Sequence, residues 1–431
     1  MNFGCAKNLV DSEVMAGYLL AAGYEIVPDA ARADVVILNT CGFIRPSRDE
    51  ADEGIREAIA FKAGRGSVRV VVTGCYAEKE KSSLKERFPE VDAWLGVKDY
   101  DQIVLAVENR VYRPGGRTFL YDHLSPRALS TPPGWAYLKV SEGCSHECAF
   151  CSIPSIKGRY RSRSVSSIVA EARSLEERGV KEIVLISQDT TYYGRDRGAR
   201  DGFPRLLGEL LKRTGLPWIR FLYGYPGEIT DPLLEVMADP RVCPYFDIPF
   251  QHAAPSVLSK MKRAMPGPQA LRLLEKIRKR LPEVAIRTSL IVGFPGESRS
   301  EFGLLAKFVK EARFDHLGVF AYCREKGTAA DILGDPVPDA EKERRRNVLM
   351  EEQAVLSAEK LKALRGRTLD VLYEATRPDH PGEFVGRTRF QAPDVDGVVF
   401  VRATGAAWKS PLRRVKIIST DMYDLRGILV T

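Results

Sequence analysis

The first 110 residues alternate between two patterns of apolar side chains. Apolar residues spaced three to four apart predict helices over residues 9–20, 49–61, 79–88 and 101–109. Short β-branched runs between them predict strands at residues 35–38 and 69–73. Strands that alternate with helices form parallel sheets covered on both faces. The pattern therefore predicts a doubly wound α/β domain over residues 1–110.

The central part of the chain repeats a strand and a helix six times, and a charged helix over residues 339–364 follows. Six units are too few for a closed eight-stranded barrel, so we predict a partial (β/α)6 barrel in a domain over residues 135–364. Residues 111–134, which contain Pro114-Gly115-Gly116 and Pro132-Pro133-Gly134, are predicted to form a linker. The predicted barrel strands are residues 135–140, 182–187, 219–223, 245–249, 285–292 and 316–322, and the helices between them are residues 165–178, 205–213, 232–238, 270–280 and 300–311.

The last segment, residues 365–431, contains short strand patterns separated by turns. A small all-β barrel of the oligonucleotide-binding (OB) type fits this pattern. The segment has 11 Arg and Lys residues against eight Asp and Glu, so its charge does not choose between an RNA and a protein substrate. The strands are predicted at residues 368–371, 382–388, 397–403, 416–419 and 425–430.

Composition and charge exclude few classes of protein. Apolar residues make up 44% of the chain and charged residues 28%, as in ordinary globular proteins. A net charge of +8 leaves room for an acidic partner such as a ribosome. No apolar run approaches the roughly 18 residues of a membrane helix, and residues 1–5 do not resemble a signal peptide. We therefore expect a cytoplasmic protein without a membrane partner. In that reducing compartment its eight cysteines are expected to serve as metal ligands or in catalysis and not to form disulfides.

One loop carries three cysteines, Cys144, Cys148 and Cys151, at C-x3-C-x2-C spacing. Three thiolates can bind three irons of a 4Fe–4S cluster and leave the fourth iron open to a small molecule. S-adenosylmethionine (SAM) suits that iron, because its amino and carboxylate groups can chelate it while an electron breaks the sulfonium C–S bond. A zinc site with His146 as fourth ligand is the alternative, which the lack of a second cysteine pair and the cramped position of His146 disfavour.

Three further cysteines, Cys5, Cys41 and Cys75, each lie where a strand ends and a helix begins. The carboxyl ends of parallel strands share one edge of a sheet, so these thiols are predicted to meet and to form a second iron–sulfur site. Only four residues precede Cys5, so most of the strand that would carry it is missing and this ligand is expected to be less firmly held. The remaining Cys243 and Cys323 are expected to be ordinary thiols.

The C-x3-C-x2-C loop resembles the signature of the radical SAM enzymes. The order of the three domains resembles the methylthiotransferases of that superfamily over essentially the whole chain, which implies that the terminal β-barrel is a TRAM domain. Three stretches are more similar to the type that modifies the small-subunit ribosomal protein S-twelve than to the type that modifies adenosine in transfer RNA. They are residues 5–13 (Cys-Ala-Lys-Asn-Leu-Val-Asp-Ser-Glu), 187–190 (Ser-Gln-Asp-Thr) and 249–253 (Pro-Phe-Gln-His-Ala).

This resemblance implies methylthiolation of the β-carbon of an aspartate in ribosomal protein S-twelve, with two 4Fe–4S clusters and SAM as cofactors. One SAM molecule would methylate a sulfur held at the Cys5, Cys41, Cys75 cluster. The other would be cleaved at the second cluster, and its 5'-deoxyadenosyl radical would remove a hydrogen from a C–H bond that offers acid–base catalysis no acidic proton. The implied partners are S-twelve or the ribosome and a low-potential electron donor such as flavodoxin or ferredoxin, with no DNA.

Further residues are assigned to binding. The resemblance places Phe150 beside the adenine of SAM. Residues at or near strand ends, namely Gln188, Asp189, Arg287 and Gly293, are expected to bind SAM, and the basic run Lys157, Arg159, Arg161 and Arg163 to line the substrate entrance. Two alternatives remain at this point: a transfer-RNA adenosine methylthiotransferase, and a non-catalytic iron–sulfur or RNA-binding protein.

Overall fold

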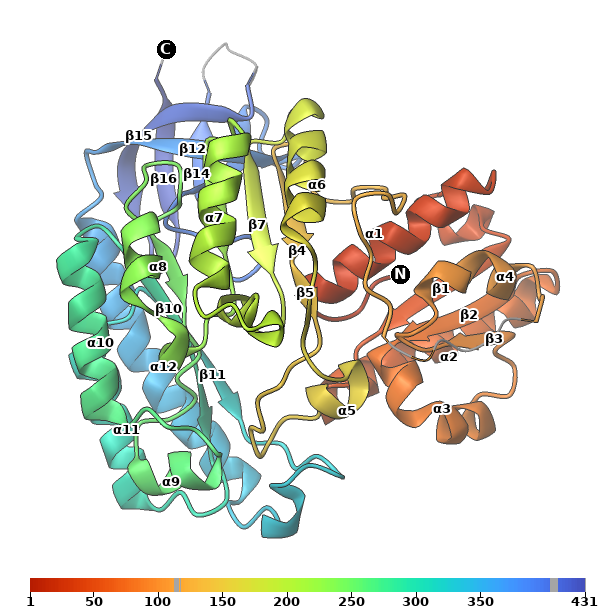
Figure 1. Cartoon of the computed structure of the whole chain (residues 1–431), viewed down its shortest axis with the longest axis horizontal. Coiled ribbons are helices and arrows are strands. Elements are labelled where there is room, and N and C mark those ends of the chain that lie inside the picture. The colour runs from red at the N-terminus through yellow and green to blue at the C-terminus, as the bar shows by residue number, and fades with distance from the viewer. Residues whose placement is uncertain (112–115, 117, 404–409, 431) are drawn as a thin grey trace.

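The structure of the chain is a computed structural model, which describes residues 1–111, 116, 118–403 and 410–430. Three units follow one another: an N-terminal α/β unit, a central barrel, and a C-terminal β unit at one end of that barrel (Figure 1). Part of the predicted linker, including Pro114 and Gly115, lies outside the described residues. In the described part of the chain, no helix is long and apolar enough to cross a membrane.

The N-terminal unit is a parallel sheet of three strands with helices on both faces. Val70 and Val72 pack against α2 and α3, whereas Val71, between them, packs on the other face against α1 and α4. The predicted doubly wound domain is thus confirmed. Strand β3 was not predicted, because three residues are too few for a periodic pattern. The elements are α1 (Ala6–Ala21), β1 (Val35–Thr40), α2 (Arg45–Arg65), β2 (Arg69–Gly74), α3 (Cys75–Arg87), β3 (Ala93–Leu95) and α4 (Ile103–Val107), with 3-10 turns at Ala30–Arg32 and Tyr100–Gln102.

A short extended segment leads to Cys5. The Phe3 N–H donates to the Asn39 carbonyl at 2.8 Å, the Asn39 N–H donates to the Met1 carbonyl at 3.0 Å, and Asn2 forms a parallel bridge with Asn39. The Asn39 side chain also donates to the Asn8 carbonyl at the start of α1. The first residues therefore follow the edge of β1 and bring Cys5 to the same end of the sheet as the other two cysteines.

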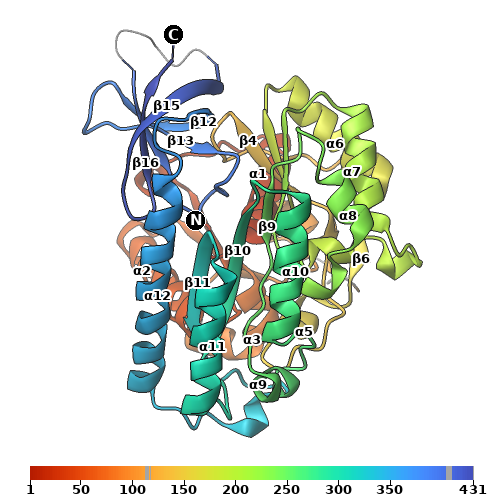
Figure 2. The same ribbon diagram turned by 90° about the vertical axis from the view of Figure 1, so that its left-hand side faces the viewer.

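The central unit is a partial barrel of six parallel strands, as predicted (Figures 1 and 2). Two three-stranded sheets meet where Ile219 forms a parallel bridge with Val242. Within the described residues, the outer strands β4 and β11 are not paired with each other, so the barrel is open at one side. The strands are β4 (Trp135–Lys139), β7 (Glu182–Ile186), β8 (Trp218–Phe221), β9 (Tyr245–Asp247), β10 (Ala285–Val292) and β11 (His316–Ala321).

Helices cover the outside of the barrel and enclose one large apolar core with its strands. The short helix α9 was not predicted. The outer helices are α6 (Val165–Glu177), α7 (Gly202–Arg213), α8 (Asp231–Val236), α10 (Gly267–Arg280), α11 (Arg299–Ala312) and α12 (Asp339–Lys362). Short elements are β5 (Ser141–Glu142), α5 (Ile153–Lys157), β6 (Arg161–Ser162), α9 (Pro255–Lys260) and 3-10 turns at Thr190–Tyr192, Arg195–Arg197, Pro226–Glu228 and Asp331–Leu333.

The C-terminal unit is a closed five-stranded barrel, which confirms the predicted small β-barrel. Val371, Val399, Val401, Val415 and Ile417 form the centre of its core. In the order in which they pair, its strands are β12 (Thr368–Thr376), β13 (Glu383–Thr388), β14 (Val399–Arg402), β16 (Leu425–Leu429) and β15 (Leu412–Thr420).

Residues 387–396, which are the end of β13 and the loop after it, are here called the floor loop, and they attach the C-terminal barrel to all six strands of the central barrel. They lie at the amino-terminal end of those strands, opposite the end that Cys144 follows. The C-terminal barrel therefore closes one end of the central barrel. The contacts are Tyr137 (β4) with Asp394 at 2.9 Å, Glu182 (β7) with Arg387 at 2.7 Å, Arg220 (β8) with the Arg389 carbonyl at 3.1 Å, Tyr245 (β9) with Asp396 at 2.6 Å, Arg287 (β10) with Asp396 at 3.5 Å, and His316 (β11) with the Phe390 carbonyl at 2.9 Å.

Candidate functional site

The loop of Cys144 to Cys151 is held in place by backbone hydrogen bonds on three sides. The Cys144 N–H donates to the Gly158 carbonyl at 3.1 Å. In the middle of the loop, the Ala149 N–H donates to the Met261 carbonyl at 3.0 Å, and the Ala149 carbonyl accepts from the Ala330 N–H at 2.7 Å. The loop is thus fastened to the end of α9 and to the segment after β11, both at the carboxyl end of the barrel.

The three thiols of this loop lie close enough to repel one another as anions. Burial, and then the charge of neighbouring groups including the other cysteines, raises the pKa of Cys144 to about 11 and that of Cys151 to about 12. Iron binds the thiolate, so three ionised thiols here require cationic charge among them, which an iron–sulfur cluster supplies. The residues present therefore fit such a cluster.

A single metal ion fits less well. Among the described residues, no three His, Cys, Asp or Glu side chains converge on one ion. A cuboidal cluster makes a different demand, because each thiolate faces its own iron. His146, the zinc ligand of the alternative interpretation, is engaged elsewhere: its Nε2 lies 2.6 Å from Asp189 Oδ2, and its ring stacks on Tyr225 with centroids 4.0 Å apart.

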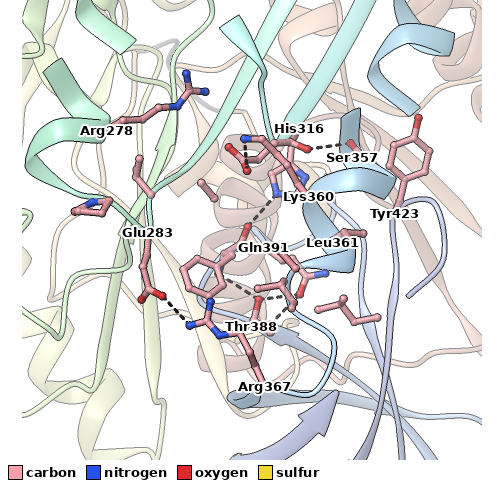
Figure 3. A pocket seen from close by; sticks show the side chains of 18 residues that line it. Arg278, Glu283, His316, Ser357, Lys360, Leu361, Arg367, Thr388, Gln391 and Tyr423 are labelled. Atoms are coloured by element: carbon pink, nitrogen blue, oxygen red, sulfur yellow. Dashed lines mark hydrogen bonds and ion pairs between the residues drawn. The ribbon is translucent and has the colours of Figure 1, made fainter. Parts of the chain in front are cut away.

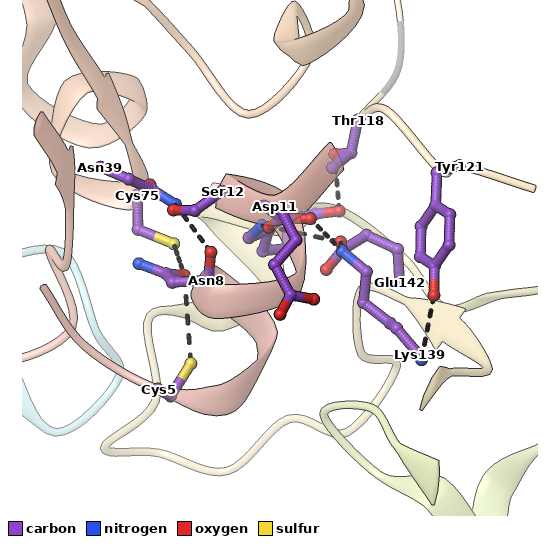
Figure 4. A network of polar contacts seen from close by, with 12 residues as sticks. Cys5, Asn8, Asp11, Ser12, Asn39, Cys75, Thr118, Tyr121, Lys139 and Glu142 are labelled. Carbon is purple, nitrogen blue, oxygen red and sulfur yellow. Dashed lines mark hydrogen bonds and ion pairs between the residues drawn. The ribbon is translucent and has the colours of Figure 1, made fainter. Parts of the chain in front are cut away.

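The structure also brings Cys5, Cys41 and Cys75 together. Asn8 lies between two of them, since the thiols of Cys5 and Cys75 donate to Asn8 Oδ1 at 3.9 and 3.7 Å (Figure 4). Gly4 adopts φ +112° and has no room for a side chain, because a Cβ there would lie 2.8 Å from Cys41 Cβ. Burial raises the pKa of Cys75 to about 12, and the charges of Cys5 and Cys41 add to this shift. This group therefore fits an iron–sulfur cluster for the same reason as the first.

Four buried charges join α1, which follows Cys5, to segments of the barrel that flank the cysteine loop, and Figure 4 shows this network beside Cys5 and Cys75. Lys139 on β4 pairs with Asp11 on α1 and, at 2.7 Å, with Glu142 on β5. Lys157, at the end of α5, lies 3.2 Å from Asp11 and 3.6 Å from Glu142. Each of the four side chains is at most 2% exposed. Although burial opposes a charge on Glu142, the two lysines lower its pKa to about 2. The network is neutral as a whole and is shared by α1 and the barrel.

Two residues of the predicted substrate entrance are therefore misassigned. Lys157 belongs to the buried network, and Arg163 is 3% exposed and pairs with Glu171 at 2.6 Å. The prediction is wrong for these two residues, because both side chains are buried and paired with carboxylates inside the protein. Arg159 is exposed and Arg161 is half-buried, so an entrance role for these two stays a prediction.

The residues predicted to bind SAM lie in two different places. Gln188 and Asp189 follow β7 and face the cysteine loop: Gln188 donates to Glu142 at 2.7 Å, and Asp189 contacts His146. Arg287 instead lies within β10 and pairs with Asp247 at 3.1 Å and with the floor loop. Gly293 has φ +74°, and a Cβ there would lie 2.3 Å from Lys342 Cγ on α12. Packing therefore accounts for this glycine, and its role in binding SAM stays a prediction.

Phe150 and the two cysteines outside the groups of three are all at least partly buried. Phe150 is half-buried and packs against the apolar cluster around α9. Cys243 is fully buried, and the Cys323 thiol donates to Glu325 at 3.6 Å. Within the described residues, neither of these thiols is part of a disulfide bond.

The backbone conformation of two residues at the barrel mouth, and one contact between them and the N-terminal unit, were not predicted from the sequence. Tyr223 and Gln251, just past β8 and β9, adopt φ of 64° and 70°, a region that non-glycine residues rarely occupy and that is concentrated at functional sites. The Lys7 ammonium lies 3.3 Å from the centre of the Tyr223 ring and thereby connects the Cys5 segment to the mouth. Neither feature has a sequence signal, because both depend on where strands end.

A cavity of about 480 Å³ lies elsewhere (Figure 3). It is bounded by the starts of β10 and β11, the ends of α10 and α12, and the C-terminal barrel. Its charged groups are largely paired with one another, Lys360 with Asp315 and Arg367 with Glu283, each at 2.7 Å. Because it opens at the amino-terminal end of the strands, this cavity is separate from the cysteine sites.

Comparison with known proteins accounts for all three units. Residues 1–96 match Uncharacterized protein family UPF0004, residues 138–309 match the Radical SAM superfamily, and residues 366–430 match the TRAM domain. A ribosomal protein uS12 methylthiotransferase RimO from Citrifermentans bemidjiense is 41% identical to this chain, over 100% of the chain and 97% of that protein. The RimO proteins of Syntrophus aciditrophicus and Aquifex aeolicus are 44% and 42% identical, over 99% of this chain and 96% of theirs.

The chain belongs to the RimO family. This membership confirms the predicted resemblance to radical SAM methylthiotransferases and agrees with the three-unit fold. Solved structures extend the likeness at the level of the fold alone. The radical SAM methyltransferase TsrM from Kitasatospora setae, with cobalamin and a [4Fe–4S] cluster bound, has 16% identity and a TM-score of 0.57, over 89% of this chain and 75% of that one. The cobalamin-dependent radical enzyme OxsB has a TM-score of 0.52, over 81% and 55%.

Proposed function

We propose that this RimO-family chain is the radical SAM methylthiotransferase that attaches a methylthio group to the β-carbon of an aspartate in ribosomal protein uS12. The relatives reported above are named for that activity, whereas none of them is named for transfer RNA. The observation that carries the proposal is the pair of three-cysteine groups, whose flanking segments are joined by one buried charge network. A reaction that combines a radical with a sulfur donor needs both sites on one substrate path.

Two 4Fe–4S clusters and SAM are the cofactors. Cys144, Cys148 and Cys151 would hold one cluster, which would supply the electron that cleaves SAM. Cys5, Cys41 and Cys75 would hold the other, at which the sulfur to be transferred would be bound. Around them, Gln188 and Asp189 present polar groups beside the cysteine loop and are proposed to orient SAM. The floor loop closes the far end of the barrel and so restricts the access of solvent to its interior.

The proposed partners are uS12 or the ribosome that contains it, together with a low-potential electron donor such as flavodoxin or ferredoxin. The net charge of +8 favours approach to the ribosome, whose RNA is anionic. We further propose that the protein works in the reducing cytoplasm, where all the free thiols of the described residues stay available to iron.

Mass analysis of ribosomal proteins from a strain with and without this chain tests the proposal. We expect uS12 to be lighter by one methylthio group in the deletion strain, and Cys148→Ala to behave like the deletion. Cys243→Ala is the matched control, because it removes a buried thiol outside both groups, and it should restore the modification. Unchanged uS12, together with transfer RNA that lacks methylthiolated adenosine, would support the transfer-RNA activity instead. If reduced protein forms no 5'-deoxyadenosine from SAM, the chain is not a radical enzyme.

A further inference from the structure

Arg263 reaches one of the proposed cluster ligands directly. Its Nη1 donates a hydrogen bond to the Cys148 sulfur at 3.6 Å. The other terminal nitrogen, Nη2, donates to the Pro249 carbonyl at 2.6 Å. One guanidinium thus spans from the cysteine loop to the end of β9, and its two nitrogens are fixed by two different segments.

The backbone before Arg263 is shaped to deliver it. Helix α9 ends just ahead, and Lys262 adopts φ 54°, the left-handed conformation in which helices usually place a glycine. The Arg263 N–H then donates to the Leu258 carbonyl at 2.8 Å. The same turn presents the Met261 carbonyl to the cysteine loop, so the side chain and the backbone of this turn contact the loop at adjacent residues.

A stack of planar groups holds the guanidinium in position. Arg263 lies 4.2 Å from the centre of the Tyr225 ring, and the opposite partner of Tyr225 is the His146 ring, at 4.0 Å with an interplanar angle of 9°. His146 in turn contacts Asp189 at 2.6 Å. The stack therefore runs from the Cys148 sulfur to a carboxylate at the end of β7, where SAM is proposed to bind.

We propose that Arg263 is a positioning residue that raises the reduction potential of the cluster held by Cys144, Cys148 and Cys151. This inference rests on the proposed function, since it takes Cys148 to be a cluster ligand. Hydrogen bonds to cluster sulfurs are among the factors that set iron–sulfur potentials. A cationic donor stabilises the extra negative charge of the reduced state more than that of the oxidised state. Losing it lowers the potential and makes the electron that cleaves SAM harder to load.

Redox titration of the full-length protein, followed by the electron paramagnetic resonance signal of the reduced cluster, tests this role. The background is the triple variant with Cys5, Cys41 and Cys75 changed to Ala, so that one cluster is observed alone. We expect Arg263→Gln to lower the ratio of reduced to oxidised cluster about tenfold at a fixed potential, which for one electron is a shift of about 59 mV. Arg263→Lys keeps the positive charge but loses the planar guanidinium, so its reduction potential should lie between those of the parent protein and Arg263→Gln.

The neighbouring Lys262→Gln is the matched control. It removes the same charge one residue away, but Lys262 is exposed and faces Glu147 at 3.9 Å. We expect no shift for this variant. The inference is overturned if the reduction potential shifts equally in Lys262→Gln and Arg263→Gln, or if it does not shift in Arg263→Gln. If Arg263→Gln loses its iron and cannot be titrated, an unshifted potential in Arg263→Lys overturns the inference instead.

Failure of the proposed function gives a separate result. If Cys148→Ala in the same background keeps the full cluster signal, Cys148 is not a ligand and the site assignment itself is wrong. If that variant loses the signal while Arg263→Gln titrates like its parent, only the role of Arg263 fails.

Discussion

Replacing Lys139 with methionine removes one of the two cations in the buried network between α1 and the barrel. Asp11 and Glu142 would then share Lys157 alone, which leaves one negative charge unpaired among side chains at most 2% exposed. Breaking a buried ion pair in this way costs about 3–5 kcal/mol of unfolding free energy. Methionine keeps an unbranched stem, so the lost charge is the main change.

Lys276→Met is the matched control, because its ion pair has nearly the same length but is exposed. Lys276 lies 2.8 Å from Asp231, and the two side chains are 48% and 80% exposed. Such a pair contributes about 0–1 kcal/mol. Burial is therefore the main difference between the two substitutions.

Hydrogen exchange of the backbone amides of α1 in the apo-protein is the most direct assay, since Asp11 lies on this helix. A loss of about 3 kcal/mol should speed exchange there roughly 100-fold, if α1 opens together with the network. Urea unfolding should show the same order of the two variants. If Lys139→Met stays within about 1 kcal/mol of Lys276→Met by both measurements, the network does not hold the two units together.

Two further predictions concern charge. In the folded protein the pKa of Glu142 is about 2, against an ordinary value of 4.5. Between these pH values the unfolded chain binds more protons than the folded chain. The stability that ionised Glu142 contributes is therefore present above pH 4.5 and is lost as the pH falls toward 2. Urea midpoints measured across that range should fall less steeply in Glu142→Gln, and parallel curves would contradict the assignment. In the floor loop, Asp396→Asn weakens contacts to Tyr245 and Arg287 and should cost about 1–3 kcal/mol of unfolding free energy. Asp394→Asn affects one part-buried contact of a residue that is itself exposed, so it should cost less in the same urea assay, and an equal or reversed order would contradict this account.

Much of the fold could be predicted because local patterns determine it. Strand β10 has the predicted limits, residues 285–292, since eight residues with buried apolar positions leave a clear signal. The meeting of Cys5, Cys41 and Cys75 was also predictable, because strand direction alone places them at one edge of the sheet. Both inferences needed only the order of the elements along the chain.

Contacts between distant segments could not be predicted. Lys157 belongs to a run of basic residues that suggests an exposed surface, and only folding reveals Asp11 beside it. Arg287 was expected at the SAM site, yet its nearest acidic partners are Asp247 and the Asp396 of the floor loop. The two acids lie 40 and about 110 residues away in the sequence, so neither periodicity nor spacing could identify them.

Counting iron after anaerobic reconstitution tests the central claim that two groups of three cysteines each hold a cluster. The account predicts about eight iron atoms per chain for the unaltered protein and about four when either group is changed to alanine. About four atoms in the unaltered protein, or zinc in place of iron, would contradict it.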